Sequence, residues 1–281
     1  MQRRSVFAVI AATALFFVAC SSSPKFTEVS PVELLGEGET AYLLIPVPQN
    51  RAFTEKAISF LSGDGDISQK DVSRLLSRLE TVALSVFSQN SDFAWTLCAS
   101  GNFPTTLSKL VLTEKNGWYK RDFENLRYYQ SEEMAISMMT DSAACASSKT
   151  ANAESTLSRW LSIQKGESAK GASDEIKSFL ESDGDGGNIR FFVPNATTFF
   201  ESFIGIPLGV KSVRGILTQV QNEELFDSEF EIEFSNPFAA LAFSAVVRRV
   251  DGVSVSEGEN GRTILRGLRV SWQQILLAVS Q

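Results

Sequence analysis

The sequence predicts an α/β (α+β) fold: two pseudo-repeats of β-α-α-β-α-β-β-α, each forming a mixed sheet covered by helices. Two short apolar runs, which stop at Pro46 and Pro194, each precede a helical pattern. In both halves a second helical pattern, a strand, a turn into a further helix, a hairpin and a closing helix follow in the same order. The pseudo-repeats would occupy residues 39–140 and 188–281.

The first repeat opens with "YLLIPV", where an apolar strand ends at a proline that cannot donate to a sheet. Apolar residues three and four apart predict its helices, and short aromatic or β-branched runs predict its strands. In order, we expect a strand at 42–47, helices at 50–61 and 68–87, a strand at 91–100, a helix within 101–112, hairpin strands at 117–122 and 125–131, and a helix at 132–140.

The second repeat opens with "IRFFVPN" and uses the same signals. "SNP" marks a turn that opens a helix, since Asn caps and Pro suits the first helical position. In order, we expect a strand at 189–195, helices at 196–206 and 209–221, a strand at 228–235, a helix at 235–247, hairpin strands at 252–257 and 262–271, and a helix at 272–280.

Residues 141–187, rich in Ser, Ala, Lys and Glu, are expected to form a linker between the repeats. The linker contains two helical patterns, at 153–165 and 173–182. It ends at the glycine-rich turn "SDGDGGN".

The N-terminus reads as an export signal, with Arg3 and Arg4 followed by the uncharged stretch 5–19. The run "FVAC" resembles a bacterial lipobox, which implies cleavage before Cys20 and attachment of a diacylglycerol to its sulfur, with palmitate among the acyl lipids carried by this residue. Residues 1–19 would then be a signal peptide, and 20–38 a lipidated tether. An ordinary secretory peptide and an uncleaved anchor are the alternatives.

The charge argues against nucleic acid as a partner. The whole chain carries −7, and loss of Arg3 and Arg4 with the signal peptide leaves −9. Binding of phosphate backbones needs clustered Lys and Arg.

The chain contains no histidine. This excludes Ser-His-Asp and Cys-His nucleophile systems and histidine zinc sites. "SGDGDISQKD" resembles a calcium loop, but its first ligand position would be Phe60, so we expect a helix-to-helix turn instead and no metal site. We therefore expect no enzyme, and no cofactor other than the covalent lipid on Cys20.

Cys98 and Cys145 are the two cysteines beyond Cys20. In an oxidising compartment they could pair as a disulfide, but their apolar surroundings suit two separate buried thiols equally well. The sequence leaves both alternatives open.

Phenylalanine is abundant, with 21 Phe against four Trp and four Tyr. Two helical patterns carry apolar stripes that would either cover the sheet or contact a lipid or membrane. The residues proposed for such contact are Phe199, Phe200, Phe203 and Ile204 in the first, and Phe238 and Leu241 in the second, where Ala242 and Ala245 extend the stripe.

The lipobox together with "GNFP", "NGWYK" and "RYYQS" resembles a group of spirochaete (treponemal-type) lipoproteins that are rich in amphipathic helices. The resemblance implies an α/β/α protein on the periplasmic face of the outer membrane, with an apolar cavity that can open and an association with lipid. It implies no catalytic residues.

We therefore expect a non-enzymatic lipoprotein, anchored in the bacterial envelope, that binds membrane lipid or another apolar ligand through Phe-rich amphipathic helices. The alternative is a structural protein of the envelope that binds a protein partner, with the Phe stripes in its core.

Overall fold

A computed structural model gives the structure of the chain. The described residues are 26–61, 69–89, 92–103, 112–132, 134–148, 150–182, 186–197, 209–220 and 225–275.

The described residues form one twelve-stranded sheet, in the order β11-β12-β10-β9-β8-β1-β2-β3-β7-β6-β5-β4. All of its pairings are antiparallel. The strands are β1 Ala41–Pro46, β2 Leu79–Gln89, β3 Asp92–Gly101, β4 Tyr119–Phe123, β5 Leu126–Gln130, β6 Ala135–Met138, β7 Ala143–Ser147, β8 Ile189–Val193, β9 Val210–Gln219, β10 Leu225–Phe234, β11 Ser254–Glu257 and β12 Thr263–Ser271.

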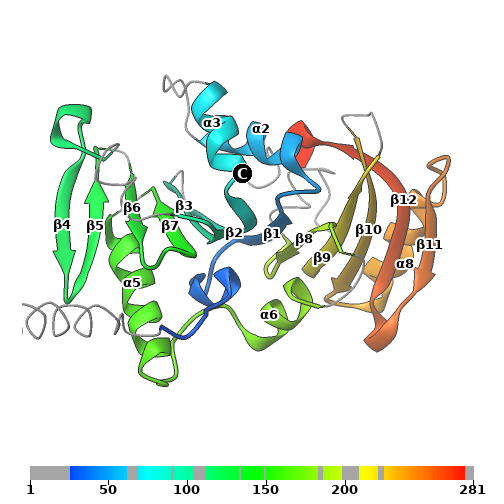
Figure 1. Cartoon of the computed structure of the whole chain (residues 1–281). Coiled ribbons are helices and arrows are strands. Elements are labelled where there is room, and N and C mark those ends of the chain that lie inside the picture. Colours follow the sequence, from blue (N-terminus) through cyan, green and yellow to red (C-terminus); the bar gives the residue numbers. More distant parts are fainter. Residues whose placement is uncertain are drawn as a thin grey trace, which may run out of the picture.

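Helices pack on both faces of this sheet (Figure 1). They are α2 Arg51–Leu61, α3 Gln69–Leu76, α5 Thr150–Gln164, α6 Asp174–Leu180 and α8 Pro237–Val247, with 3-10 turns η1 Pro31–Leu34, η2 Glu114–Asn116 and η3 Glu259–Gly261.

The prediction of two separate mixed sheets is wrong, because β1 and β8 pair with each other. These strands, which open the two predicted repeats, lie antiparallel with Leu43 opposite Phe191. Pairing between them satisfies backbone groups that would otherwise form two exposed sheet edges. The two halves therefore share one continuous sheet.

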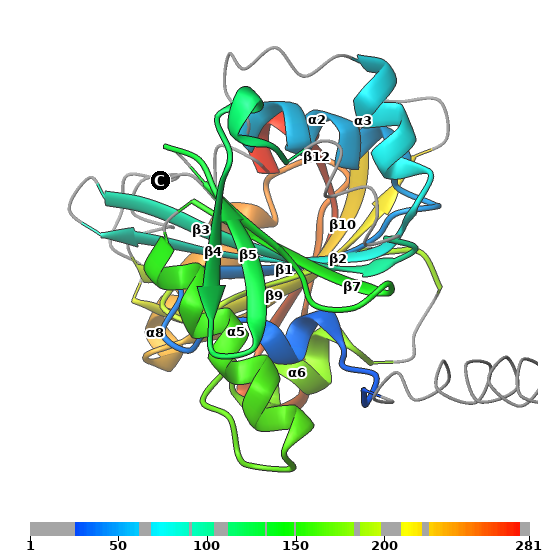
Figure 2. The ribbon, with the colours of Figure 1, turned by 60° about the vertical axis from the view of Figure 1, so that its left-hand side comes forward.

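Side chains of β1 show how the layers divide. Ala41, Leu43 and Ile45 point to the face that also holds apolar residues of α2 and α8. Tyr42 and Leu44 point to the opposite face, where η1, α5 and α6 pack. Figure 2 shows α2 and α3 on one side of the sheet and α5 and α6 on the other.

The helix expected at 209–221 is wrong, because this segment forms β9. A bulge interrupts its pairing with β10: Ser212 lies opposite Glu233, whereas Val210 lies opposite the next residue, Phe234. The bulge brings Val210 and Val213 into the same apolar cluster. A spacing of three within a strand imitates the helical period in the sequence.

Two further predicted helices also contain strands. The second part of 68–87 belongs to β2, whose two faces are both buried, so its apolar run does not alternate. The helix expected at 132–140 is replaced by the short strand β6, where Ala135 and Ser137 are buried alternately.

The predicted linker, 141–187, is part of the folded body. It contributes β7, which pairs with β3, followed by α5 and α6. The two predicted helices are present, and the strand before them was missed.

Residues 29–36 of the predicted tether pack into the folded body, whereas Glu37 and Gly38 are exposed. Ser30 and Glu33 form a capping box that starts η1, and Val32, Leu34 and Leu35 are at most 1% exposed. This segment packs with α5, α6 and the sheet in one apolar cluster.

Candidate functional site

Helix α8 owes its start to two local signals. The Asn236 side chain accepts a hydrogen bond from the Ala239 N–H at 2.9 Å, and Pro237 occupies the first helical position. No charged residue lies between Pro237 and Val247. Apart from Ser244, every side chain of the helix is apolar.

Most of α8's large side chains face solvent. Phe238 is 81% exposed, Leu241 67% and Val246 59%, and just beyond the helix Val250 is 48% exposed. Phe243 is buried against the sheet among residues of β9, β10 and β12. An apolar surface of this kind marks a site of contact with another molecule or a membrane.

The stripe predicted from the sequence is the outer face of α8. Phe238, Leu241, Ala242 and Ala245 are all exposed. These residues therefore do not cover the sheet, and the structure leaves them available for contact. The other predicted contact residues, Phe199, Phe200, Phe203 and Ile204, lie outside the described residues.

Cys20, the predicted lipidation site, also lies outside the described residues. The first described residues pack against α5, where the rings of Phe26 and Trp160 lie 5.0 Å apart between centroids. Thr27 and Gln164 exchange two hydrogen bonds, of 2.7 and 2.8 Å. These contacts fix the point at which a tether from Cys20 would join the folded body.

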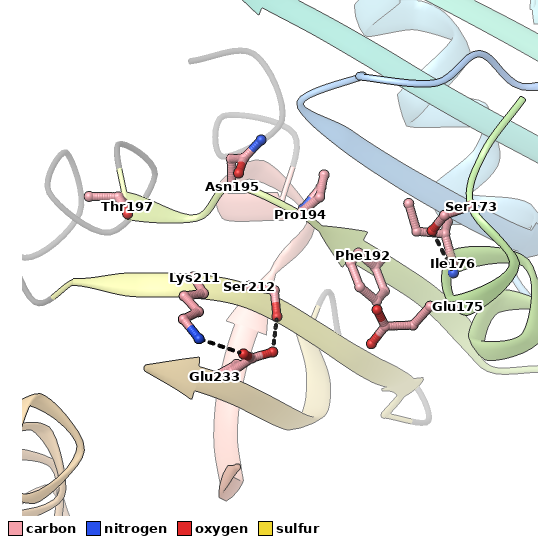
Figure 3. Close-up of a pocket in the computed structure, with 10 residues that line it drawn as sticks. All are labelled: Ser173, Glu175, Ile176, Phe192, Pro194, Asn195, Thr197, Lys211, Ser212 and Glu233. Atoms are coloured by element: carbon pink, nitrogen blue, oxygen red, sulfur yellow. Dashed lines mark hydrogen bonds and ion pairs between the residues drawn. The ribbon is translucent and has the colours of Figure 1, made fainter. Parts of the chain in front are cut away.

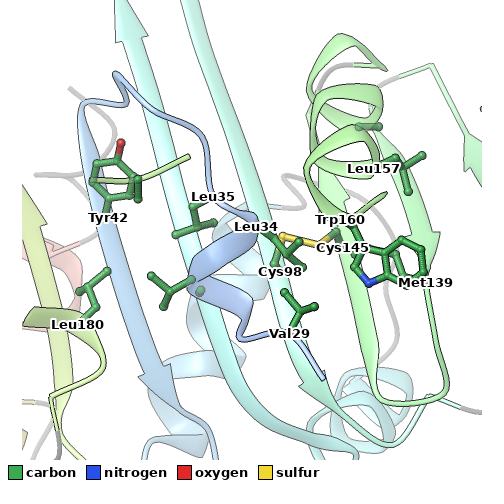
Figure 4. Close-up of a cluster of buried hydrophobic side chains, with 14 of the residues drawn as sticks. Val29, Leu34, Leu35, Tyr42, Cys98, Met139, Cys145, Leu157, Trp160 and Leu180 are labelled. Atoms are coloured by element: carbon green, nitrogen blue, oxygen red, sulfur yellow. A yellow bond between two sulfur atoms is a disulfide. The ribbon is translucent and has the colours of Figure 1, made fainter. Parts of the chain in front are cut away.

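Cys98 and Cys145 form a disulfide between β3 and β7 (Figure 4). The two residues are directly opposite in the strand register, with Cα atoms 4.2 Å apart, and both are buried. Of the two alternatives that the sequence left open, the structure has the bridge. It lies in the apolar cluster that contains η1, Leu157 and Trp160.

A pocket of about 450 Å³ lies between α6 and strands β8 and β9 (Figure 3). Glu233 accepts hydrogen bonds there from Lys211 Nζ at 3.2 Å and Ser212 Oγ at 3.4 Å. Asn195 and Glu175 add further polar groups to its rim. This polar lining does not suit an acyl chain, so this pocket is not the apolar cavity that the resemblance implies.

A buried polar group supports the core beside η1. The Tyr42 hydroxyl donates to the Gly36 carbonyl at 2.9 Å, and burial raises the pKa of Tyr42 to about 12. Burial also raises the pKa of the Glu39 carboxyl, which the Arg159 guanidinium opposes. Burial lowers the pKa of Arg159, whose Nε donates to the Leu34 carbonyl at 2.9 Å. These groups hold η1 in place.

Within the described part of the chain, His, Cys, Asp and Glu side chains do not gather into a group able to hold a metal ion. Every helix described is too short or too polar to cross a bilayer.

Sequence reasoning missed two features around these surfaces. The burial of residues 29–35 was missed, although "SPVEL" carries the signature of a capping box. Arg248 and Arg249, both exposed at the end of α8, were also passed over. The signal for them was a pair of arginines directly after an uncharged helix.

Comparison with known proteins places these observations in context. Residues 27–276 match the sequence model of a family described as outer membrane-associated lipoprotein TP0453. Outer membrane protein TP0453 of Treponema pallidum (strain Nichols) is 22% identical over 278 residues, which cover 96% of this chain and 92% of that protein.

Solved structures have the same fold. Crystal forms I and IV of TP0453 superpose with TM-scores of 0.68 and 0.67, at 18% and 17% identity. Each comparison covers 90% of this chain and 98% of the solved chain.

Proposed function

Because this chain belongs to the TP0453 family of outer membrane-associated lipoproteins, we propose that it contacts membrane lipid directly through helix α8. In this proposal the protein is not an enzyme. Cys20 carries the acyl chains that anchor it, and the folded body lies on the periplasmic face of the outer membrane.

The observation that carries the proposal is the outer face of α8. Phe238 and Leu241 leave most of their surface in water. Transfer of a Phe or Leu side chain into an apolar environment is worth about 1.5–3 kcal/mol. A helix that lies in the membrane interface with its apolar side toward the acyl chains gains this free energy.

The proposed anchor adds to this contact. Several acyl chains on Cys20 bind a membrane firmly, at about 0.8 kcal/mol per buried methylene group. Once tethered, the body would meet the bilayer at a high effective concentration. A modest affinity of α8 would then be enough to hold it against the lipid surface.

The absence of histidine supports the proposal that the protein is not an enzyme. Common nucleophile and proton-transfer systems depend on imidazole. Apolar contact requires none of this chemistry.

The test uses an unacylated chain that begins at Ser21, which retains every described element and core cluster. We expect it to sediment with phosphatidylcholine vesicles. Phe238→Ser combined with Leu241→Ser should weaken the partition by about a hundredfold or more, because about 1.5–3 kcal/mol is lost for each buried side chain.

Tyr119→Ser is the matched control, since Tyr119 is 51% exposed on β4, at the other end of the sheet. It should bind as the parent does. If the folded parent does not bind vesicles, the lipid proposal is wrong and a protein partner for α8 takes its place.

A further inference from the structure

Two arginines extend the exposed face of α8. Arg248 is the C-cap of the helix, and its N–H donates to the carbonyls of Ser244 and Val246. The turn continues, because the N–H of Arg249 donates to the Val246 carbonyl at 3.1 Å. The backbone of this pair is therefore fixed by hydrogen bonds.

Arg249 lies in the turn directly after α8, which ends at Val247, and helical phasing would align it with the exposed stripe of the helix. It follows Phe238 by eleven residues, and at about 100° per residue this is close to three full turns. Arg249 therefore continues the line of Phe238, Leu241, Ala242 and Ala245. Long cationic side chains at the end of such a face can rest their stems on apolar surface and place the charge at the membrane interface.

These arginines differ from those of the neighbouring strand. On β12 and its preceding turn, Arg262 pairs with Glu175 at 2.6 Å, Arg266 with Glu229 at 2.7 Å and Arg269 with Asp227 at 3.3 Å. None of the described carboxylates forms an ion pair with Arg248 or Arg249.

The local charge also contrasts with the whole chain. Residues 235–250 contain two arginines and no acidic residue, in a protein of net charge −7. Cations at a helix C-terminus interact favourably with the helix dipole and so stabilise the helix. That effect concerns the stability of α8 and gives no reason for the apolar surface beside the arginines.

We infer that α8 together with Arg248 and Arg249 binds anionic phospholipid, with the guanidinium groups on headgroup phosphates. The inference rests on the proposed membrane contact of α8 and adds its lipid class. Guanidinium and phosphate form paired, charge-assisted hydrogen bonds. Apolar contact alone would not distinguish between headgroups, whereas the arginines favour a negatively charged surface.

The experiment compares vesicles of phosphatidylcholine with vesicles of phosphatidylcholine and phosphatidylglycerol in equal amounts. The unacylated chain from Ser21 should bind the mixed vesicles more tightly, and added salt should reduce the difference. Arg248→Gln combined with Arg249→Gln should weaken binding to the mixed vesicles by roughly 30-fold, at about fivefold for each charge. Its binding to pure phosphatidylcholine should change little.

Lys120→Gln combined with Arg121→Gln provides the matched control. Both residues are exposed on β4, at the opposite edge of the sheet, and the change in net charge is the same. This variant should keep the preference for phosphatidylglycerol.

Two outcomes would overturn the inference. One is equal binding of the parent to both kinds of vesicle, and the other is an equal loss in the two charge variants. Failure of the proposed function is distinguishable, because it would appear with neutral vesicles: no binding, or no effect of the Phe238 and Leu241 substitutions.

Discussion

Helices α5 and α8 both pack on the sheet, but they expose opposite kinds of surface. Helix α5 carries Glu154, Arg159 and several hydroxyl side chains, yet its Leu157 and Trp160 are each only 1% exposed. Helix α8 has no charge and leaves Phe238 largely in water. The more polar helix is thus the better buried.

The difference shows that the burial of a helix depends on which segments of the chain pack against it, and not on its own composition. The side of α5 that carries Trp160 packs against residues 29–35, the disulfide and the sheet in a single apolar cluster. Among the described residues, α8 finds a partner on one side, through Phe243. The α5 region therefore stabilises the fold, while the α8 region has apolar surface to offer elsewhere.

The largest expected effect tests the α5 side of this comparison. Trp160→Ala should lower the free energy of unfolding by about 3–5 kcal/mol, because it leaves a cavity in the core. Phe238→Ala should change it by less than about 0.5 kcal/mol, as at other exposed positions. Urea denaturation measures both, and equal losses would mean that the outer face of α8 is packed in solution.

The disulfide sharpens the comparison, because it lies in the α5 cluster. The Cys98–Cys145 bridge spans 47 residues. Its removal in Cys98→Ala with Cys145→Ala should cost about 2–5 kcal/mol, chiefly by enlarging the unfolded ensemble. Thermal unfolding with and without reductant checks this. The unfolding temperature of the double variant should not change with reductant. If the unfolding temperature of the parent did not change either, the prediction would be contradicted.

The smallest effect concerns Glu39, beside Arg159 of α5. Burial raises its pKa above the ordinary 4.5, so the folded state keeps the proton longer than the unfolded state as the pH rises. Ionisation therefore costs stability above pH 4.5, and none of this cost is present below it. Glu39→Gln should be more stable than the parent at neutral pH, with a difference that disappears in acid.

Thermal unfolding across this pH range measures the effect of Glu39→Gln. Glu37→Gln is the control, since Glu37 is an exposed neighbour. A Glu39→Gln chain less stable than the parent at neutral pH would mean that the carboxylate's attraction to Arg159 outweighs its burial.

Much of the secondary structure followed from local signals. The hairpin β4–β5, strands β11 and β12, and helix α8 lie where the sequence predicted them, because turn residues and caps act over a few positions. The family resemblance, carried by the lipobox and short motifs, is confirmed by the match over 27–276. The functional role of the stripes remains a prediction.

The wrong elements have specific causes. Strand β9 looked helical because a bulge places Val210 and Val213 on one face, and β2 looked helical because both of its faces are buried. A pattern records which residues are apolar, but not which neighbour covers them. Neither error could be detected without knowing which strands pair with β2 and β9.

Residues within a few turns of one another specify the apolar stripe of α8, its Asn236 cap and the arginines that end it, so these features can be predicted from the sequence. Contacts across the fold set the direction of each stripe: that of α8 faces outward and that of α5 faces inward. Such contacts also join the two halves into one sheet. These outcomes depend on contacts between residues far apart in the chain. Local periodicity does not show which distant segment will pack against a given apolar face.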